Sequence, residues 1–181
     1  MTNRLVILSD MWGSKKGLWI TSYLGYLQQY YDITFYDCQH LANINIAIDS
    51  AENVNKEFIN GGIDTAVTHL LTKETEPSNY LAFSTGGTIA WKAALRGLPM
   101  KSLYAISSTR LRLENKKPID DIKLLYGEHD EFGPTQEWIG AMEVDSEKVA
   151  NFGHNLYTDE KIISKVCRDL LNKIMQKEFV A

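Results

Sequence analysis

Ser84 is the residue of this 181-residue chain whose surroundings best suit nucleophilic catalysis. It lies in the run A-F-S-T-G-G of residues 82–87, after an apolar run typical of a strand and before a stretch with helical spacing. A serine on such a sharp strand-to-helix turn has an exposed hydroxyl, and small residues two before and two after it let strand and helix approach closely. The backbone N–H of Thr85 would then point at an oxyanion forming on a bound carbonyl. The alternative is an ordinary turn or N-cap serine.

Reactive or unusual residues also follow other predicted strands. In an open parallel sheet, ligands bind at the carboxyl ends of the strands, so loops that come directly after strands are the places to expect chemistry. Four loops qualify, at residues 9–14, 84–87, 127–130 and 153–154. The same rule disfavours Asp120 and Asp121, because they precede a strand and belong to the opposite end of the sheet.

The run around Ser84 resembles the nucleophile elbow of the α/β-hydrolase superfamily, G-x-S-x-G, with Ala82 in place of the first glycine. The family's chain order is nucleophile, acid, histidine, each on a loop after a later strand. The resemblance implies that Asp130, three residues after a glycine, is the acid that orients the imidazole. It implies that His154, in a Gly-His pair, is the base, and Glu128 remains the rival acid. The other histidines, His40, His69 and His129, fit the order less well.

The loop S-D-M-W-G-S after the first predicted strand resembles the family's oxyanion loop, which usually begins His-Gly. Ser9 and Asp10 stand in those two places, and in this register the Met11 N–H is the second oxyanion donor. An acidic Asp10 would oppose negative charge forming nearby. We expect it to point away, either capping the helix that begins near Lys15 or pairing with Lys15 or Lys16.

The elements that must position these loops alternate along the chain. Short apolar runs predict strands at residues 5–8, 33–36, 80–83, 103–106 and 122–126, with a weaker sixth at 149–152. Helical spacing predicts helices at residues 18–27, 51–71, 88–96, 134–142 and 159–177, the second with a possible break at Gly61-Gly62. This pattern predicts a three-layer, doubly wound α/β domain with a mostly parallel sheet of about six strands, spanning residues 1–181.

The resemblance covers nearly the whole chain but implies a trimmed α/β-hydrolase fold. The oxyanion-like loop follows the first strand, so the two antiparallel strands that usually open the sheet are absent. The segment between residues 106 and 122 is too short for the helical lid that many members insert there. We therefore expect a shallow, open pocket bordered by Met11, Trp12, Phe132 and Trp138, although these side chains could equally pack in the core.

Composition narrows the class of protein. With 19 Lys and Arg against 23 Asp and Glu, the net charge is −4, which gives no basic face for nucleic acid. Cys38 and Cys167 are too few for a disulfide scaffold and lack the spacing of a zinc site. No apolar run is long enough for a membrane span or a signal peptide, so we expect a cytoplasmic protein without membrane, metal or cofactor.

These observations favour a serine hydrolase, an esterase or thioesterase, that acts on a small acyl ester through Ser84, His154 and Asp130. Asp10 motivates an alternative, a hydrolase-like binding protein that has lost catalysis. A third interpretation is a phosphate- or nucleotide-binding domain that uses residues 84–87 as an anion cradle. It ranks last because the chain lacks both glycine-rich phosphate motifs, G-x-G-x-x-G and G-x-x-x-x-G-K-[ST].

Overall fold

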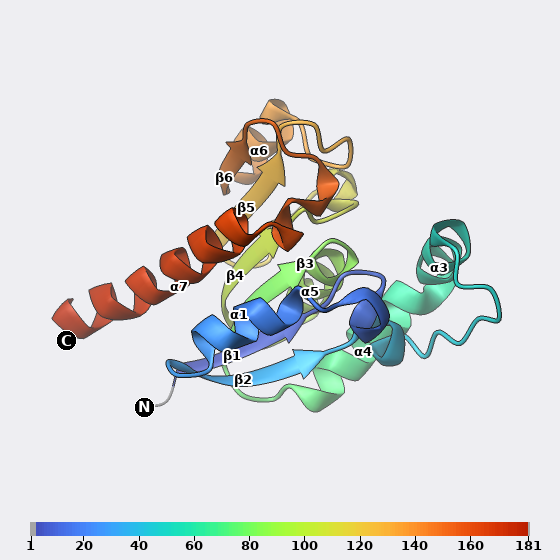
Figure 1. Ribbon diagram of the computed structural model, residues 1–181, viewed down its shortest axis with the longest axis horizontal. Helices are drawn as coiled ribbons and strands as arrows, with labels where there is room; N and C mark the ends of the chain where they lie inside the picture. The colour runs from blue at the N-terminus through green and yellow to red at the C-terminus, as the bar shows by residue number, and fades with distance from the viewer. Residues whose placement is uncertain (1–2, 181) are drawn as a thin grey trace.

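The computed structural model describes residues 3–180, which form a six-stranded sheet covered by helices (Figure 1). The strands run in the order β2-β1-β3-β4-β5-β6, and each neighbouring pair is parallel. Their bounds are β1 Asn3–Leu8, β2 Tyr31–Tyr36, β3 Ser78–Phe83, β4 Met100–Ile106, β5 Ile122–Gly127 and β6 Asp145–Val149. The predicted α/β class with about six strands is confirmed, and the described sheet is parallel throughout.

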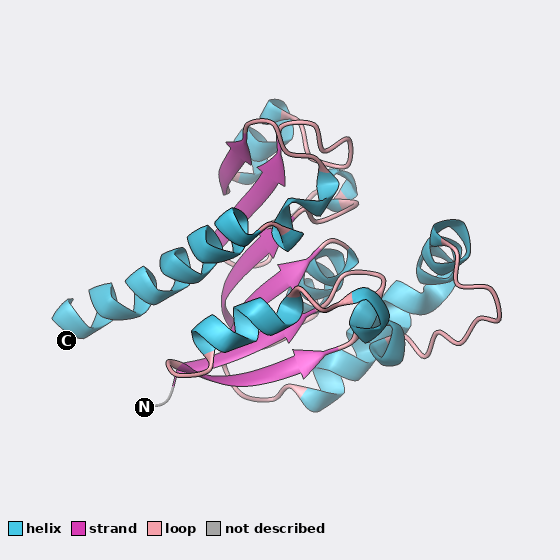
Figure 2. Ribbon diagram, viewed as in Figure 1, coloured by secondary structure: helices cyan, strands magenta, loops and turns pink. Residues whose placement is uncertain are grey.

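Helices cover both faces of the sheet (Figure 2). One face carries α1 Ile20–Leu27 and α7 Glu160–Val180. The other carries α2 Cys38–Leu41, α3 Ala51–Glu57, α4 Ile63–Lys73, α5 Thr85–Leu95 and α6 Gln136–Met142. The shorter helical turns are η1 Gly13–Lys16, η2 Phe58–Gly62, η3 Leu111–Leu113 and η4 His154–Thr158. Within residues 3–180, no helix combines the length and the apolar character needed to cross a membrane.

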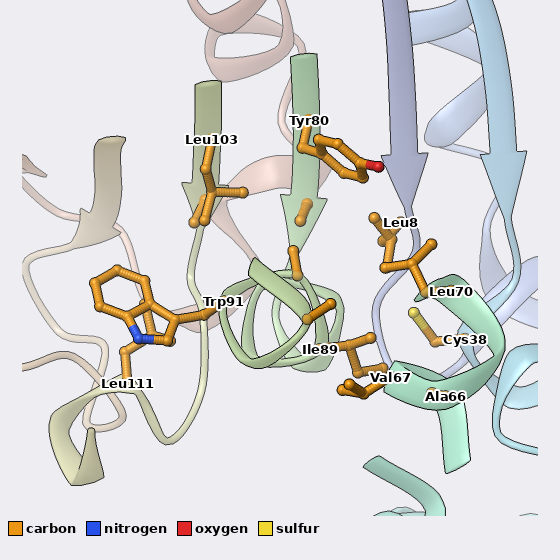
Figure 3. Packing of buried hydrophobic residues seen from close by; sticks show 14 of the residues in the cluster. Leu8, Cys38, Ala66, Val67, Leu70, Tyr80, Ile89, Trp91, Leu103 and Leu111 are labelled. Atoms are coloured by element: carbon orange, nitrogen blue, oxygen red, sulfur yellow. The ribbon is translucent and has the colours of Figure 1, made fainter. Parts of the chain in front are cut away.

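Side chains that alternate along the strands divide the core into two layers. Val6, Leu8 and Tyr80 point to the α4–α5 side, whereas Leu5 and Ile7 point to the α1–α7 side. Both sets are almost fully buried, as expected for a parallel sheet covered on both faces. Figure 3 shows the first layer, in which side chains from three strands pack against Trp91 of α5 and the apolar residues of α4.

The boundary differences that matter for the site are at β6 and α5, whereas one predicted helix break is confirmed. The sixth strand is β6 Asp145–Val149, and residues 149–152 had been predicted. The prediction was wrong because this edge strand is mostly polar, whereas the apolar residues used to locate it lie at its end and in the turn that follows. The helix predicted from residue 88 begins at Thr85, directly after Ser84. The predicted helix 51–71 is broken as its glycines indicated, with Gly61 at φ 124° inside η2 between α3 and α4.

The topology brings several loops to one edge of the sheet. Because all described strands are parallel, the loops after β1, β3, β4, β5 and β6 lie at the same end. The strand order changes direction between the neighbouring strands β1 and β3. From β1 the chain continues outward to β2 on one side, and from β3 it continues to β4 on the other side. Such a switch point leaves a crevice at the strand ends.

Candidate active site

Ser84 occupies a strained turn between β3 and α5. Its backbone has φ 49° and ψ −117°, a conformation that residues other than glycine rarely adopt. Strain of this kind persists only where surrounding contacts enforce it, and it is common at active sites. Here the Ser84 N–H donates to the carbonyl of Ile106 at 2.9 Å, and the Gly87 N–H donates to the carbonyl of Ser84 at 3.1 Å. The hydroxyl therefore projects from a rigidly held turn.

Two glycines allow this turn to lie so close to its neighbours. A Cβ atom placed on Gly86 would lie 2.3 Å from the Ser9 carbonyl oxygen, at the end of β1. A Cβ atom on Gly87 would collide with the side chain of Ser108, which follows β4. The first turn of α5 is thus wedged between the ends of two strands, and only residues without a side chain fit there.

Ser84, His154 and Asp130 form a continuous hydrogen-bonded chain. The Ser84 Oγ lies 2.9 Å from Nε2 of His154, and Nδ1 of His154 lies 3.0 Å from Oδ2 of Asp130. The Asp130 side chain is fully buried, whereas that of His154 is 25% exposed. When Nδ1 carries the proton and donates it to the carboxylate, Nε2 is left as the acceptor for the serine hydroxyl.

Backbone contacts tie the loop of Asp130 to the loop of His154. The Glu128 N–H donates to the Val149 carbonyl, and the His129 N–H donates to the Phe152 carbonyl, both at 2.9 Å. A Cβ atom on Gly127 would lie 2.3 Å from the Phe152 carbonyl oxygen, so this approach requires glycine. The two loops therefore form one rigid unit at the ends of β5 and β6.

The rival acid Glu128 points elsewhere. Its Oε2 accepts a hydrogen bond from the Asn151 N–H at 3.0 Å, and its side chain is 52% exposed. Asp130 is positioned by its own loop, because its Oδ1 also accepts the Phe132 N–H at 3.0 Å. Of these two acids, only Asp130 contacts the His154 ring.

The Met11 and Thr85 N–H groups come from the two loops at the switch point. Within residues 3–180, neither donates to a protein acceptor, so both are available to a ligand. The Trp12 N–H, in contrast, donates to Oδ1 of Asp10 at 3.0 Å. The Met11 carbonyl accepts a hydrogen bond from Nε2 of Gln39 at 2.8 Å, which fixes the peptide plane of the loop.

The Asp10 side chain was expected to cap a helix or to pair with a lysine, and it does neither. It is buried, and its Oδ2 accepts the hydroxyl of Tyr157 at 3.0 Å. Lys15 pairs with Asp49, and the ammonium of Lys16 lies over the ring of Trp12. Burial raises the pKa of the Asp10 carboxyl, and the hydrogen bonds from Tyr157 and Trp12 oppose that rise.

A cavity of about 500 Å³ opens beside Ser84 and His154. Met11, Trp12 and Phe132 line it, and the rings of Phe132 and His154 form an edge-to-face pair with centroids 5.0 Å apart. Trp138 does not line it, contrary to expectation. Its ring packs against Trp91 in the core, and its Nε1–H donates to the Glu114 carbonyl at 2.8 Å. The amphipathic pattern of α6 could not distinguish a pocket wall from a core contact.

Two parts of the cavity wall were not predicted. Helix α3 and the turn after it contribute Glu52, Asn55 and Ile59, so the segment between β2 and β3 partly covers the site. The loop after β4 contributes Arg110 and Arg112. The strand-end rule that located the other loops applies equally to this one, and that signal could have found both arginines.

The remaining histidines lie away from this chain of groups. Nδ1 of His69 contacts the Leu41 carbonyl at 2.7 Å, and His40 lies beside it in a separate surface cavity of about 710 Å³. His129 is 67% exposed beside Glu128. Within the described part of the chain, no group of three or more His, Cys, Asp or Glu side chains could hold a metal ion.

No protein-family model matches the sequence, and no curated protein sequence matches it at a significant level. Similarity appears in the comparison of structures. Alpha/beta hydrolase domain-containing protein 10 from mouse is 12% identical, with a TM-score of 0.66 over 97% of this chain and 91% of that one. MGS-MChE2, an alpha/beta hydrolase enzyme from a lagoon-sediment metagenome, is 14% identical, with a TM-score of 0.65 over 98% and 93%. Est1E from Butyrivibrio proteoclasticus is 12% identical, with a TM-score of 0.65 over 96% and 89%.

At these identities the likeness concerns the arrangement of the chain. It extends over nearly the full length of the protein and of each neighbour named above. The likeness agrees with the parallel sheet and the helices on both of its faces in this protein. The protein has the α/β-hydrolase fold.

Proposed function

We propose that this protein is a serine hydrolase that cleaves a carboxylic ester or thioester of a small acyl group. The observation that carries this proposal is the hydrogen-bonded chain from Ser84 through His154 to Asp130, with 2.9 Å and 3.0 Å separations. A nucleophile, a base and an orienting acid in this geometry are the requirements for acyl transfer. The fold supports the same conclusion, because its structural neighbours include an alpha/beta hydrolase enzyme.

The proposed reaction begins when Ser84 Oγ attacks the carbonyl carbon and its proton passes to Nε2 of His154. The negative charge that develops on the carbonyl oxygen is stabilised by the N–H groups of Met11 and Thr85. His154 then returns the proton to the departing alcohol or thiol as the bond to the acyl carbon breaks. A water molecule, activated by the same histidine, hydrolyses the acyl-enzyme and regenerates the serine.

The test combines covalent labelling with turnover. A fluorophosphonate should label the wild-type protein, because the reagent reacts with an activated serine. The protein should also hydrolyse members of a panel of short- and medium-chain nitrophenyl esters and acyl thioesters. Ser84→Ala should abolish labelling and lower kcat by a factor on the order of 10⁴–10⁶. Ser22→Ala is a matched control, because Ser22 lies on α1 outside the cavity, where its hydroxyl donates to Glu160.

Two results would contradict the proposal. Hydrolysis by Ser84→Ala within a few-fold of wild type would exclude Ser84 as the nucleophile. A folded wild-type protein that is neither labelled nor active on the panel would favour the alternative, a hydrolase-like binding protein without catalysis.

A further inference from the structure

The wall formed by the loop after β4 places two positive charges in the proposed active site. Arg110 and Arg112 line the same 500 Å³ cavity as Ser84 and His154. The proposed chemistry assigns them no role, because a catalytic triad and two N–H donors are sufficient for the hydrolysis of an ester. In a chain with a net charge of −4, two arginines beside the nucleophile are an unexpected concentration of positive charge.

Among the described side chains, the Arg110 guanidinium has no partner. It is half-buried, and with the side chains of residues 3–176 it forms no ion pair and no hydrogen bond. Two other arginines are paired: Arg4 contacts Glu74, and Arg96 contacts Asp64. The guanidinium nitrogens of Arg110 are not among the buried unpaired side-chain atoms, so they face the water of the cavity. An acceptor group of a ligand could replace that water and pair with the free N–H donors.

The backbone holds Arg110 in an uncommon conformation. Its φ of 58° and ψ of −3° lie in the left-handed region, which arginine seldom adopts. The flanking residues hold this conformation: Leu111 is fully buried, and the Thr109 carbonyl accepts the Thr88 hydroxyl of α5 at 2.6 Å. Local strain that the surroundings maintain is typical of ligand-binding positions.

Arg112 lines the same cavity as Arg110 and contacts a second loop of its wall. Its Nη1 donates to the Phe132 carbonyl at 2.9 Å, which ties the loop after β4 to the loop that carries Asp130. The side chain is exposed and contacts no carboxylate in the described residues, so its positive charge still acts on the cavity. The loop that carries both arginines is therefore tied to the loop that carries Asp130 of the triad.

The charge of the cavity favours an anionic ligand. Glu52 of α3 lines the cavity too, and it forms no ion pair with either arginine. Two positive groups against one negative group leave a net positive charge, which favours an anionic ligand group over an uncharged one. The planar guanidinium also matches a carboxylate, which it can bind through two parallel hydrogen bonds.

From these observations we propose that Arg110, assisted by Arg112, forms a carboxylate-binding subsite, and that the substrate is an ester or thioester carrying a free carboxylate. This inference rests on the proposed hydrolase function for the identity of the cleaved bond. The arginine–carboxylate contact itself is independent of catalysis and can be tested separately.

The kinetic test compares two esters of equal chain length, mono-4-nitrophenyl adipate and 4-nitrophenyl hexanoate. Wild-type protein should prefer the adipate by about tenfold or more in kcat/KM, as expected for a charge-assisted hydrogen bond. Arg110→Met should reduce this ratio about tenfold, and Arg110→Lys should retain part of it, since the charge remains without the planar fork. Arg96→Met is the matched control: Arg96 pairs with Asp64 outside the cavity, so activity and ratio should stay at the wild-type values.

A binding measurement separates this proposal from the hydrolase proposal. Calorimetric titration of Ser84→Ala with monomethyl adipate should detect binding, which Arg110→Met in the same background should weaken about tenfold. Binding without turnover of either ester would support the subsite and contradict the hydrolase. Equal turnover of both esters, with no effect of Arg110→Met on the ratio, would overturn the carboxylate proposal and leave the hydrolase intact. Failure of Ser84→Ala to bind monomethyl adipate, or binding that Arg110→Met leaves unchanged, would also overturn it.

Discussion

Replacing Asp130 with asparagine should disable the proposed base while leaving the fold intact. The amide would keep the shape of the side chain but place an N–H group 3.0 Å from Nδ1 of His154, where Oδ2 now lies. That group would donate to Nδ1 and move the ring proton to Nε2, which could then no longer accept the proton of Ser84. The substitution also removes the negative charge that stabilises the imidazolium.

The size of the effect follows from that distance. Two opposite charges about 3 Å apart attract each other by about 5 kcal/mol at an effective dielectric constant of about 20. Loss of this attraction when the imidazolium forms corresponds to a fall in kcat on the order of 10³–10⁴-fold. The assay is steady-state hydrolysis of the best nitrophenyl ester, with circular dichroism to show that the variant is folded.

Glu128→Gln is the matched control for Asp130→Asn. The glutamine side chain would retain a carbonyl oxygen to accept the Asn151 N–H, so kcat should stay within about threefold of wild type. The reasoning is refuted if Glu128→Gln is the damaging change, or if Asp130→Asn lowers kcat by less than about tenfold.

Two further predictions concern the first turn of α5 and the buried acid. Gly86→Ala would force a Cβ atom to within 2.3 Å of the Ser9 carbonyl oxygen, so urea denaturation should detect a loss of about 1–3 kcal/mol together with lost activity. Gly140→Ala has open space around it and should be neutral or slightly stabilising, and equal losses in both variants would contradict the packing argument. Asp10→Asn should gain stability relative to wild type as pH rises from 4 to 7. Because burial raises the pKa of the Asp10 carboxyl above its unfolded value, ionisation in that range destabilises only the wild type. A relative stability that falls with pH would contradict this sign.

The strand ends were predictable because a parallel strand buried on both faces is a continuous run of apolar residues in the sequence. Apolar runs located the first five strands, and the end of each strand fixed the loop that follows it, including the turn of Ser84. The sixth strand was misplaced because an edge strand is half-exposed and need not be apolar. This error did not affect the prediction that His154 lies on a loop after the sixth strand, because His154 follows the observed strand by only a few residues.

Side-chain direction was less predictable than loop position. Trp138 and Phe132 are both aromatic residues near the end of the sheet, yet the first packs on Trp91 and the second faces His154. Which way each ring turns depends on neighbours that are distant in sequence. Arg110 illustrates the same limit, because its left-handed backbone is enforced by contacts of its neighbours with α5 and the core.

Asp10 shows why the oxyanion loop could not be interpreted from its own sequence. The neighbouring sequence suggested Lys15 and Lys16 as partners, but the carboxylate accepts a hydrogen bond from Tyr157, which lies 147 positions along the chain. Tyr157 belongs to the same turn as His154, so the buried hydrogen bond joins the loop that carries Met11 to the loop that carries the base. The acid that first suggested an impaired oxyanion hole thus holds together two loops whose relative position the proposed catalysis requires.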